Sequence, residues 1–154
     1  MNIVATDPRD PQVALLLAAS DAYMHALYPA DSNYLDSVQV LAAPNVHFVG
    51  AWLGGQLVAC GALKLMQDSD GAYGEVKRVF VLPEHRSQGY SKAVMLALEA
   101  HARVLQLPRL RLELGIYQPE ALSLYLMMGF APRGPFGQYP PDPLSLFMEN
   151  ALTH

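Results

Sequence analysis

The sequence has little of several features that mark specialised classes of protein. Its single cysteine, Cys60, cannot form an internal disulfide, which favours a reducing compartment. Within "LVACGAL" we interpret this residue as a small buried hydrophobe. The apolar stretch "VALLLAA" is too short to span a bilayer, and the N-terminus "MNIVATDPRD" lacks the basic region of a secretory signal. We therefore expect a cytoplasmic protein with no membrane partner.

Charge is also sparse, at 16% of residues with a formal net charge of -4, and the basic residues form no runs. We accordingly expect no nucleic-acid partner. The histidines are scattered and have no cysteine in a short motif, so we expect no metal site. The Walker A pattern GxxxxGK[ST] and the dinucleotide fingerprint GxGxxG are both absent, which argues against binding of nucleoside triphosphates or dinucleotides.

What is present is a chain of 52% apolar residues, long enough to bury a core as one domain over residues 1–154. Periodicity and turn residues predict strands over 1–7, 45–53, 56–66, 75–82 and 109–116, near Phe130 and over 145–149. They predict helices over 11–28, 32–41, 87–106 and 119–128, and a loop over 67–74. The strand-helix-strand unit from Glu75 to Ile116 requires a parallel pair, so the sequence predicts a mixed α/β layer fold.

The stretch "VFVLPEHRSQGYSKAV" (residues 79–94) leads from a strand into a helix with no acidic residue after Glu84. A helix N-terminus presents unpaired N–H groups and partial positive charge, which suit an anion. Gly89 and the small Ser91 allow close approach of a ligand, and Arg86 adds a donor for phosphate oxygens. The turn alone could also be a helix start with an arginine on the surface.

Two further segments, "LRLELGI" and "QPEALSLYLMMGF", accompany this turn, and together the three resemble the GNAT superfamily of acyl-CoA-dependent N-acetyltransferases. The family's pyrophosphate loop [QR]-x-x-G-x-[GA] matches residues 86–91, with Ser91 in place of Gly or Ala. Its pattern N-x-x-A-x-x-[LF]-Y matches residues 118–125, with Gln118 in place of Asn. The resemblance implies a mostly antiparallel sheet with one splayed parallel strand pair, helices on both faces, and acetyl-CoA as the acyl donor without a metal. The cofactor-binding residues it implies are Val79, Phe80, Val81, Arg86, Ser87, Gln88, Gly89, Tyr90, Ser91 and Gln118.

The resemblance also implies roles in catalysis. The N–H of Val81, or of a neighbour exposed by a bulge, would polarise the thioester carbonyl. Tyr125 would be the general acid for the departing thiolate, a transfer uphill by only about 2 kcal/mol from ordinary pKa values, although a core tyrosine is the other interpretation. The general base would be Glu75, with Glu113 as its rival and His47 a third choice. Either carboxylate could instead form an ion pair across the sheet.

The expected acceptor is the primary amine of a small or amino-acid-like molecule, contacted by Tyr28, Tyr34 and Arg78. Two other functions stay open: a non-catalytic acyl-CoA-binding sensor module, and acetylation of a protein or peptide, which an open groove beside Glu75 would favour. An exposed C-terminal strand would also permit a homodimer.

Overall fold

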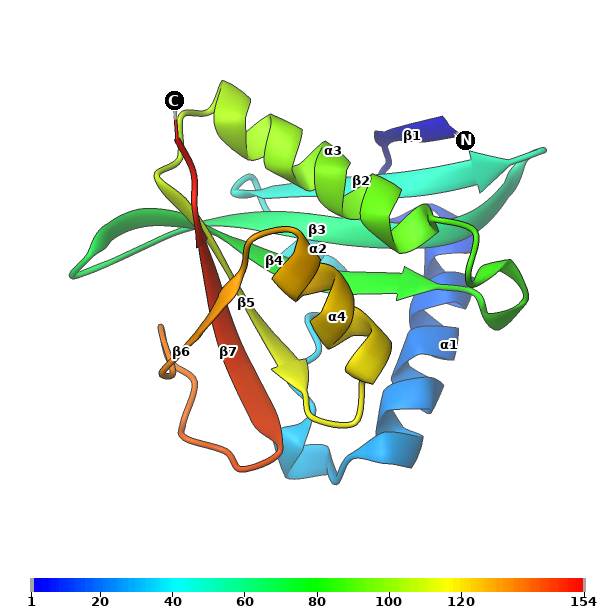
Figure 1. Cartoon of the computed structure of the whole chain (residues 1–154). Coiled ribbons are helices and arrows are strands. Elements are labelled where there is room, and N and C mark those ends of the chain that lie inside the picture. Colours follow the sequence, from blue (N-terminus) through cyan, green and yellow to red (C-terminus); the bar gives the residue numbers. More distant parts are fainter. Residues whose placement is uncertain (1, 154) are drawn as a thin grey trace.

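The protein, described by a computed structural model over residues 2–153, is a twisted sheet covered by helices (Figure 1). Its strands are β1 (Asn2–Ala5), β2 (Val46–Leu53), β3 (Gln56–Asp68), β4 (Gly71–Val81), β5 (Arg109–Gly115), β6 (Ala131–Arg133) and β7 (Ser145–Ala151). Its helices are α1 (Pro11–Leu27), α2 (Val38–Leu41), α3 (Tyr90–Val104) and α4 (Pro119–Met127), with 3-10 turns at Ala30–Ser32 and Pro83–His85.

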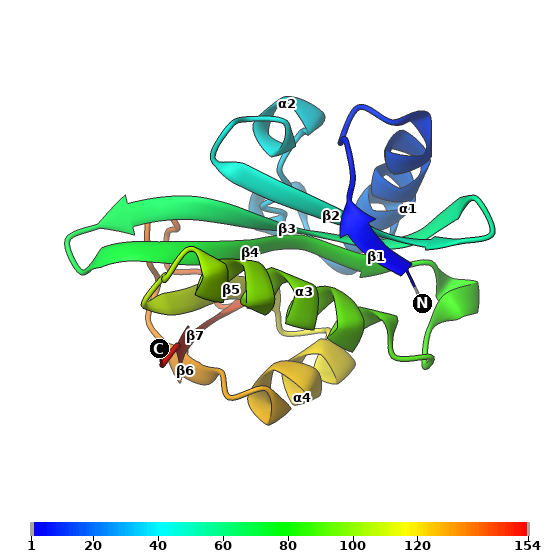
Figure 2. The same cartoon turned by 90° about the horizontal axis from the view of Figure 1, so that it is seen from above.

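The strands form one sheet in the order β1-β2-β3-β4-β5-β7-β6. Every neighbouring pair is antiparallel except β4 and β5, which are parallel and joined by the crossover through α3. Helices α1 and α2 lie on one face of the sheet and α3 and α4 on the other (Figure 2). The predicted mixed α/β fold with helices on both faces is therefore confirmed.

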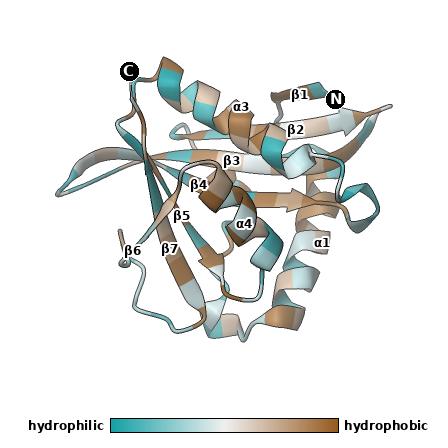
Figure 3. Cartoon of the chain, in the orientation of Figure 1, coloured by the Kyte–Doolittle hydropathy of each residue, from teal (hydrophilic) through white to brown (hydrophobic). Residues whose placement is uncertain are grey.

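Two apolar clusters hold the helices to the sheet. One lies under α3 and α4 and includes Leu110, Leu112 and Leu114, the apolar face of the alternating strand β5. The other lies under α1 and α2 and includes Phe48 and Phe80. Helix α3 shows hydrophobic and hydrophilic residues in alternation along its length, as expected of a helix with one face on a sheet (Figure 3).

Strand β4 contains a β-bulge. Its register with β3 passes from Cys60↔Phe80 to Ala62↔Lys77, so two residues of β4, Arg78 and Val79, lie opposite one residue of β3. Arg78 has a left-handed backbone with φ of 58°, a conformation that non-glycine residues adopt at a cost. The bulge bends β4 at the point where the parallel pairing with β5 stops.

Some predicted boundaries are wrong. The helix predicted over 32–41 is reduced to a 3-10 turn and the four residues of α2, because residues 33–37 are held extended by distant partners. Lys77 Nζ donates to the carbonyl of Tyr34 at 2.8 Å, and the Tyr34 hydroxyl donates to Asp142 at 2.9 Å. The helix predicted from Ser87 begins at Tyr90, because Gly89 has φ of 84°.

Two further expectations about strands are also wrong. The loop predicted over 67–74 is a tight hairpin, since β3 continues to Asp68 and β4 starts at Gly71. The C-terminal strand β7 is not an exposed edge, because it lies between β5 and β6. The stated reason for expecting a homodimer therefore no longer applies.

Candidate active site

A pocket opens where the two parallel strands separate. Strands β4 and β5 are paired only at Gly74↔Leu110, Glu75↔Arg111 and Val76↔Leu112. Beyond these residues the strands diverge (Figure 1). The pocket between them is lined by Ser20, Tyr23, Met24, Tyr34, Leu35, Val76, Lys77, Arg78, Val79, Phe80, Leu112, Glu113, Leu114, Gly115, Gln118, Ala121 and Tyr125.

The edge of β4 that faces this gap has backbone groups turned away from β3. Leu82 N–H donates to the Val58 carbonyl of β3 at 2.9 Å, so the alternation of an antiparallel ladder turns the N–H and C=O of Val81 away from β3. The same alternation through the paired residue Phe80 turns Val79 toward the gap. An extended ligand could therefore add to β4 as a strand.

The start of α3 lies at the end of β4. The helix has no acidic residue in its first turn and is preceded by left-handed Ser87 and Gly89, with φ of 63° and 84°. The first-turn N–H groups of a helix have no intrahelical acceptor, which makes this end a site for an anion. Arg86 packs beside it, with its guanidinium 4.8 Å from the Tyr23 ring centroid and its Nε donating to the Val81 carbonyl at 3.4 Å.

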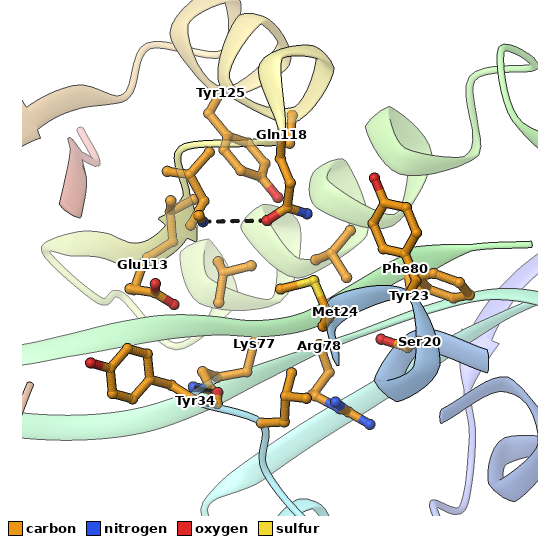
Figure 4. Close-up of a pocket in the computed structure, with 17 residues that line it drawn as sticks. Ser20, Tyr23, Met24, Tyr34, Lys77, Arg78, Phe80, Glu113, Gln118 and Tyr125 are labelled. Carbon is orange, nitrogen blue, oxygen red and sulfur yellow. Dashed lines mark hydrogen bonds between the residues drawn. The ribbon is translucent and has the colours of Figure 1, made fainter. Parts of the chain in front are cut away.

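Tyr125 reaches the pocket from α4. Its side chain is buried, its ring packs against Phe130 at 5.8 Å between centroids, and it lies beside Gln118 in Figure 4. Burial raises the pKa of Tyr125 to about 12, so the hydroxyl stays a proton donor through the neutral range. Gln118 accepts a hydrogen bond from the Gly115 N–H at 3.3 Å, drawn as the dashed line in Figure 4.

The two carboxylates expected as bases occupy different environments. Glu113 lines the pocket, and its Oε2 accepts a hydrogen bond from Ser145 Oγ at 2.7 Å. Burial raises the pKa of Glu113, while the Ser145 hydrogen bond and the charge of Lys77 act in the opposite direction. Glu75 does not line the pocket and accepts a hydrogen bond from the Tyr139 hydroxyl at 2.5 Å.

Two loops meet on the side of the pocket where Tyr34 lies. Tyr34, from the segment before α2, contacts Tyr139 edge-on at 5.2 Å between centroids and donates to Asp142 at 2.9 Å. Lys77 joins the same loops, since its Nζ donates to the Tyr34 carbonyl and to the Tyr139 hydroxyl, each at 2.8 Å. In Figure 4, Tyr34, Lys77 and Arg78 lie on the opposite side of the pocket from Gln118 and Tyr125.

The structure thus brings together many of the residues singled out in the sequence. Those that line the pocket are Val79, Phe80, Arg78, Tyr34, Glu113, Gln118 and Tyr125. Val81 and residues 86–91 lie beyond its lining, at the junction of β4 and α3. Tyr28 also lies outside it: the ring stacks on Tyr117 at 5.5 Å and the hydroxyl accepts from the Tyr117 N–H at 3.0 Å.

Two residues of the site were missed: Lys77 and Ser145. A lysine inside the otherwise apolar strand was the one available sequence signal, because Ser145 comes from a strand far along the chain. Tyr139 lies in "GPFGQYPPDP", a segment that the sequence suggests as part of the acceptor rim. His47 lies on β2 with its ring stacked on His101 of α3 at 3.7 Å, and it does not line the pocket. Cys60 is buried, and burial raises the pKa of its thiol to about 12, as suits the expected small hydrophobe.

Among residues 2–153, no group of three or more His, Cys, Asp or Glu side chains is arranged to hold a metal ion. In the same part of the chain no helix has the length and apolar character needed to cross a membrane.

Comparison with known proteins places these features in one family. The model of the acetyltransferase (GNAT) family matches residues 13–130. The chain is 44% identical to "IAA acetyltransferase" of Azospirillum brasilense, over 99% of this chain and 98% of that protein.

Solved structures agree. A Klebsiella pneumoniae protein assigned to the acyl-CoA N-acyltransferases superposes with a TM-score of 0.80 at 37% identity, covering 99% of this chain and 97% of the other. PaiA N-acetyltransferase of Thermoplasma acidophilum, in complex with coenzyme A, shares the fold with a TM-score of 0.70 at 16% identity over 99% and 100% of the two chains.

Proposed function

The chain belongs to the acetyltransferase (GNAT) family and is an acetyl-CoA-dependent N-acetyltransferase, and we propose that its acceptor is the primary amine of a small molecule. The observation that carries this proposal is the pocket between the diverging strands, with Tyr125 on one side and Glu113 on another. Acetyl-CoA supplies an acetyl group on a thioester, which an amine can attack directly. The residues of the pocket then have to bind two substrates and move two protons.

The residues at the junction of β4 and α3 fit the acyl donor. The α3 N-terminus, with residues 86–91, would hold the pyrophosphate, and left-handed Gly89 keeps this approach free of a Cβ. The gap-facing N–H groups of Val79 and Val81, with the Val79 carbonyl, would pair with the pantetheine arm as an added strand. Val79 N–H, beside the bulge and at the pocket, is our choice for the donor to the thioester oxygen.

We assign the general base to Glu113 in preference to Glu75. Glu113 faces the pocket, whereas the Oε2 of Glu75 is occupied by the Tyr139 hydroxyl away from it. The amine nitrogen must lose a proton as the C–N bond forms, and a carboxylate with its pKa raised by burial is a better acceptor for that proton. The Ser145 hydrogen bond to Oε2 leaves the other oxygen of Glu113 for this role.

Tyr125 would supply the proton to sulfur as the C–S bond breaks. With its pKa at about 12 and a thiol near 8.5, complete transfer is uphill by about 5 kcal/mol, more than the ordinary values imply. We therefore assign Tyr125 a hydrogen bond to sulfur that passes its proton as the bond breaks, with no free thiolate formed first.

The contacts of Tyr34 favour a small acceptor. They join the segment before α2 to the loop that holds Tyr139 and Asp142, at one side of the pocket. This arrangement is the reason to prefer a small molecule to a protein or peptide acceptor.

The experiment is release of CoA thiol from acetyl-CoA across a panel of amines, amino acids and short peptides, with Tyr125→Phe beside the wild type. We expect release that requires a small amine and falls steeply in the variant. Binding of acetyl-CoA is measured in the same preparation by titration calorimetry. Acetyl-CoA binding without release for any acceptor would favour the sensor module, and release with peptides alone would contradict a small acceptor.

A further inference from the structure

Arg78 lines the pocket, and the bulge in β4 places its side chain on the α1 face of the sheet. In a regular strand, neighbouring side chains alternate between faces. Here Lys77 bonds to Tyr34 and Arg78 to Asp21 of α1, so two consecutive cationic side chains lie on the α1 face of the sheet. The next residue, Val79, returns to the cluster under α3. The left-handed backbone at Arg78, with φ of 58°, is the local cost of this arrangement.

The guanidinium of Arg78 is buried but only partly paired. Its side chain is 2% exposed, and Nη1 donates to Asp21 Oδ1 at 2.7 Å, while Asp21 itself is 44% exposed at the surface of α1. Among the described residues Nε finds no hydrogen-bond acceptor, although it is buried. Buried donors in native proteins are almost always satisfied, so an unpaired one calls for a missing partner. Lys77, by contrast, already donates to two oxygens.

The Nε side of a guanidinium is suited to a carboxylate, which it can bind through two parallel N–H···O bonds. The rest of the pocket is compatible with such a ligand. Its lining includes apolar and aromatic side chains, those of Tyr23, Met24, Tyr34 and Leu35. Glu113 and Arg78 lie at different sides of the pocket (Figure 4), so it offers a negative group for an ammonium and a positive group for an acid.

We propose that Arg78 binds a carboxylate of the acceptor, so that the substrate is an amino acid with an apolar or aromatic side chain. This inference rests on the proposed function, because it assigns the second substrate of the same pocket. Arg78 acts on binding of the acceptor and takes no part in the proton transfers.

The test compares acceptors that differ only in the carboxylate: phenylalanine with 2-phenylethylamine, and leucine with 3-methylbutylamine. In the wild type we expect kcat/KM at least tenfold higher for the amino acid of each pair. Arg78→Gln should remove that preference by lowering kcat/KM for the amino acid, and Arg78→Lys should keep only part of the preference. Arg109→Gln, which removes an arginine bonded to the Asp70 carbonyl, serves as the matched control.

A second measurement does not depend on catalysis. The amine-free acids 3-phenylpropanoate and 4-methylpentanoate should raise the Tm of the wild type and of Arg109→Gln, and leave that of Arg78→Gln unchanged. Equal rates on both members of each pair would overturn the inference and leave the proposed function standing. Arg78-dependent binding of the acids without any acetyl transfer would support the inference and count against the proposed function. Absence of both transfer and acid binding would overturn the inference.

Discussion

Ser145 provides a sharp test of Glu113 as the general base, because its hydroxyl contacts the carboxylate and does not line the acceptor pocket. Ser145 Oγ donates to Glu113 Oε2 at 2.7 Å, and Ser145 is buried while Glu113 is half-buried. Such a bond favours the ionised carboxylate and lowers the pKa of Glu113 against the opposing effect of burial. Ser145→Ala removes this contribution without altering the carboxylate itself.

The size of the effect follows from the hydrogen bond. A hydrogen bond to a charged group stabilises the charged form by about 1.5–3 kcal/mol, and a water molecule that takes the place of the Ser145 hydroxyl would recover part of this energy. A net loss of about 1.4 kcal/mol reduces the ionised fraction of Glu113 roughly tenfold at pH values where the carboxylate is mostly protonated. The base must be ionised to accept a proton, so the acidic limb of the kcat/KM profile should move to higher pH. Activity on the alkaline plateau should stay near the wild-type value.

The assay is kcat/KM for one acceptor across the stable pH range of each protein, with Ser123→Ala on the exposed surface of α4 as the control. Glu113→Gln should abolish the acidic limb together with most of the activity, and Glu75→Gln should leave the limb in place. An acidic limb that does not move in Ser145→Ala, or a loss of activity that is equal at every pH, would show that Glu113 is not the general base.

Three further variants test other parts of the account. Tyr125→Phe should lower kcat about 10²-fold or more with little change in the KM for acetyl-CoA, because the general acid is lost. Stopped-flow thiol release measures kcat, and a change below threefold would remove Tyr125 from the mechanism. Gly89→Val should raise the KM for acetyl-CoA about tenfold and leave kcat unchanged, because a β-branched residue adopts φ of 84° only at a steric cost. An unchanged KM would count against the α3 N-terminus as the phosphate site. Arg111→Met should lower the free energy of unfolding by about 3 kcal/mol, since Arg111 is 1% exposed and bonds to Asp68, Asp70 and Glu149. Urea denaturation measures this free energy, and a loss near zero would show this network of ion pairs to be dispensable.

The same network predicts how stability depends on pH. A backbone hydrogen bond from Asp70 together with Arg111 lowers the pKa of Asp68, and Arg111 and Arg133 lower that of Glu149 although burial alone would raise it. A carboxyl whose pKa is lower in the folded state stabilises the protein above its unfolded pKa, near 4, and that stabilisation is lost as the pH falls. The wild type should therefore lose Tm more steeply than Arg111→Met when the pH is lowered into this range.

Features set by neighbouring residues could be predicted from the sequence. Asp10 accepts from the Gln12 N–H at 2.8 Å at the start of α1, as expected of an N-cap followed by proline. The strand-turn-helix unit around Gly89 and the alternation of β5 were predictable for the same reason, because each depends on a local pattern. The family followed from motifs within these segments.

Features set by distant contacts could not be predicted. Glu75 and Glu113 are both acidic residues on the neighbouring strands β4 and β5, and nothing local distinguishes them as bases. The difference comes from Tyr139, 64 residues beyond Glu75, and from Ser145, 32 residues beyond Glu113. Residues 33–37 fail as a helix for the same reason, since Lys77 and Asp142 hold Tyr34 in an extended segment. The site thus depends on pairings that only the folded chain creates.

The most direct test of the central claim, direct transfer between two substrates in one pocket, is the initial-rate pattern with acetyl-CoA and a productive acceptor varied together. We expect intersecting double-reciprocal lines, an N-acetylated acceptor formed in equal amount with CoA, and no acetylated protein by mass spectrometry when the acceptor is omitted. The buried Cys60, with its thiol pKa raised to about 12, is unsuited to carry an acyl group. Parallel lines with an acetylated protein intermediate would contradict direct transfer, and thiol release without an acetylated acceptor would contradict the transferase assignment itself.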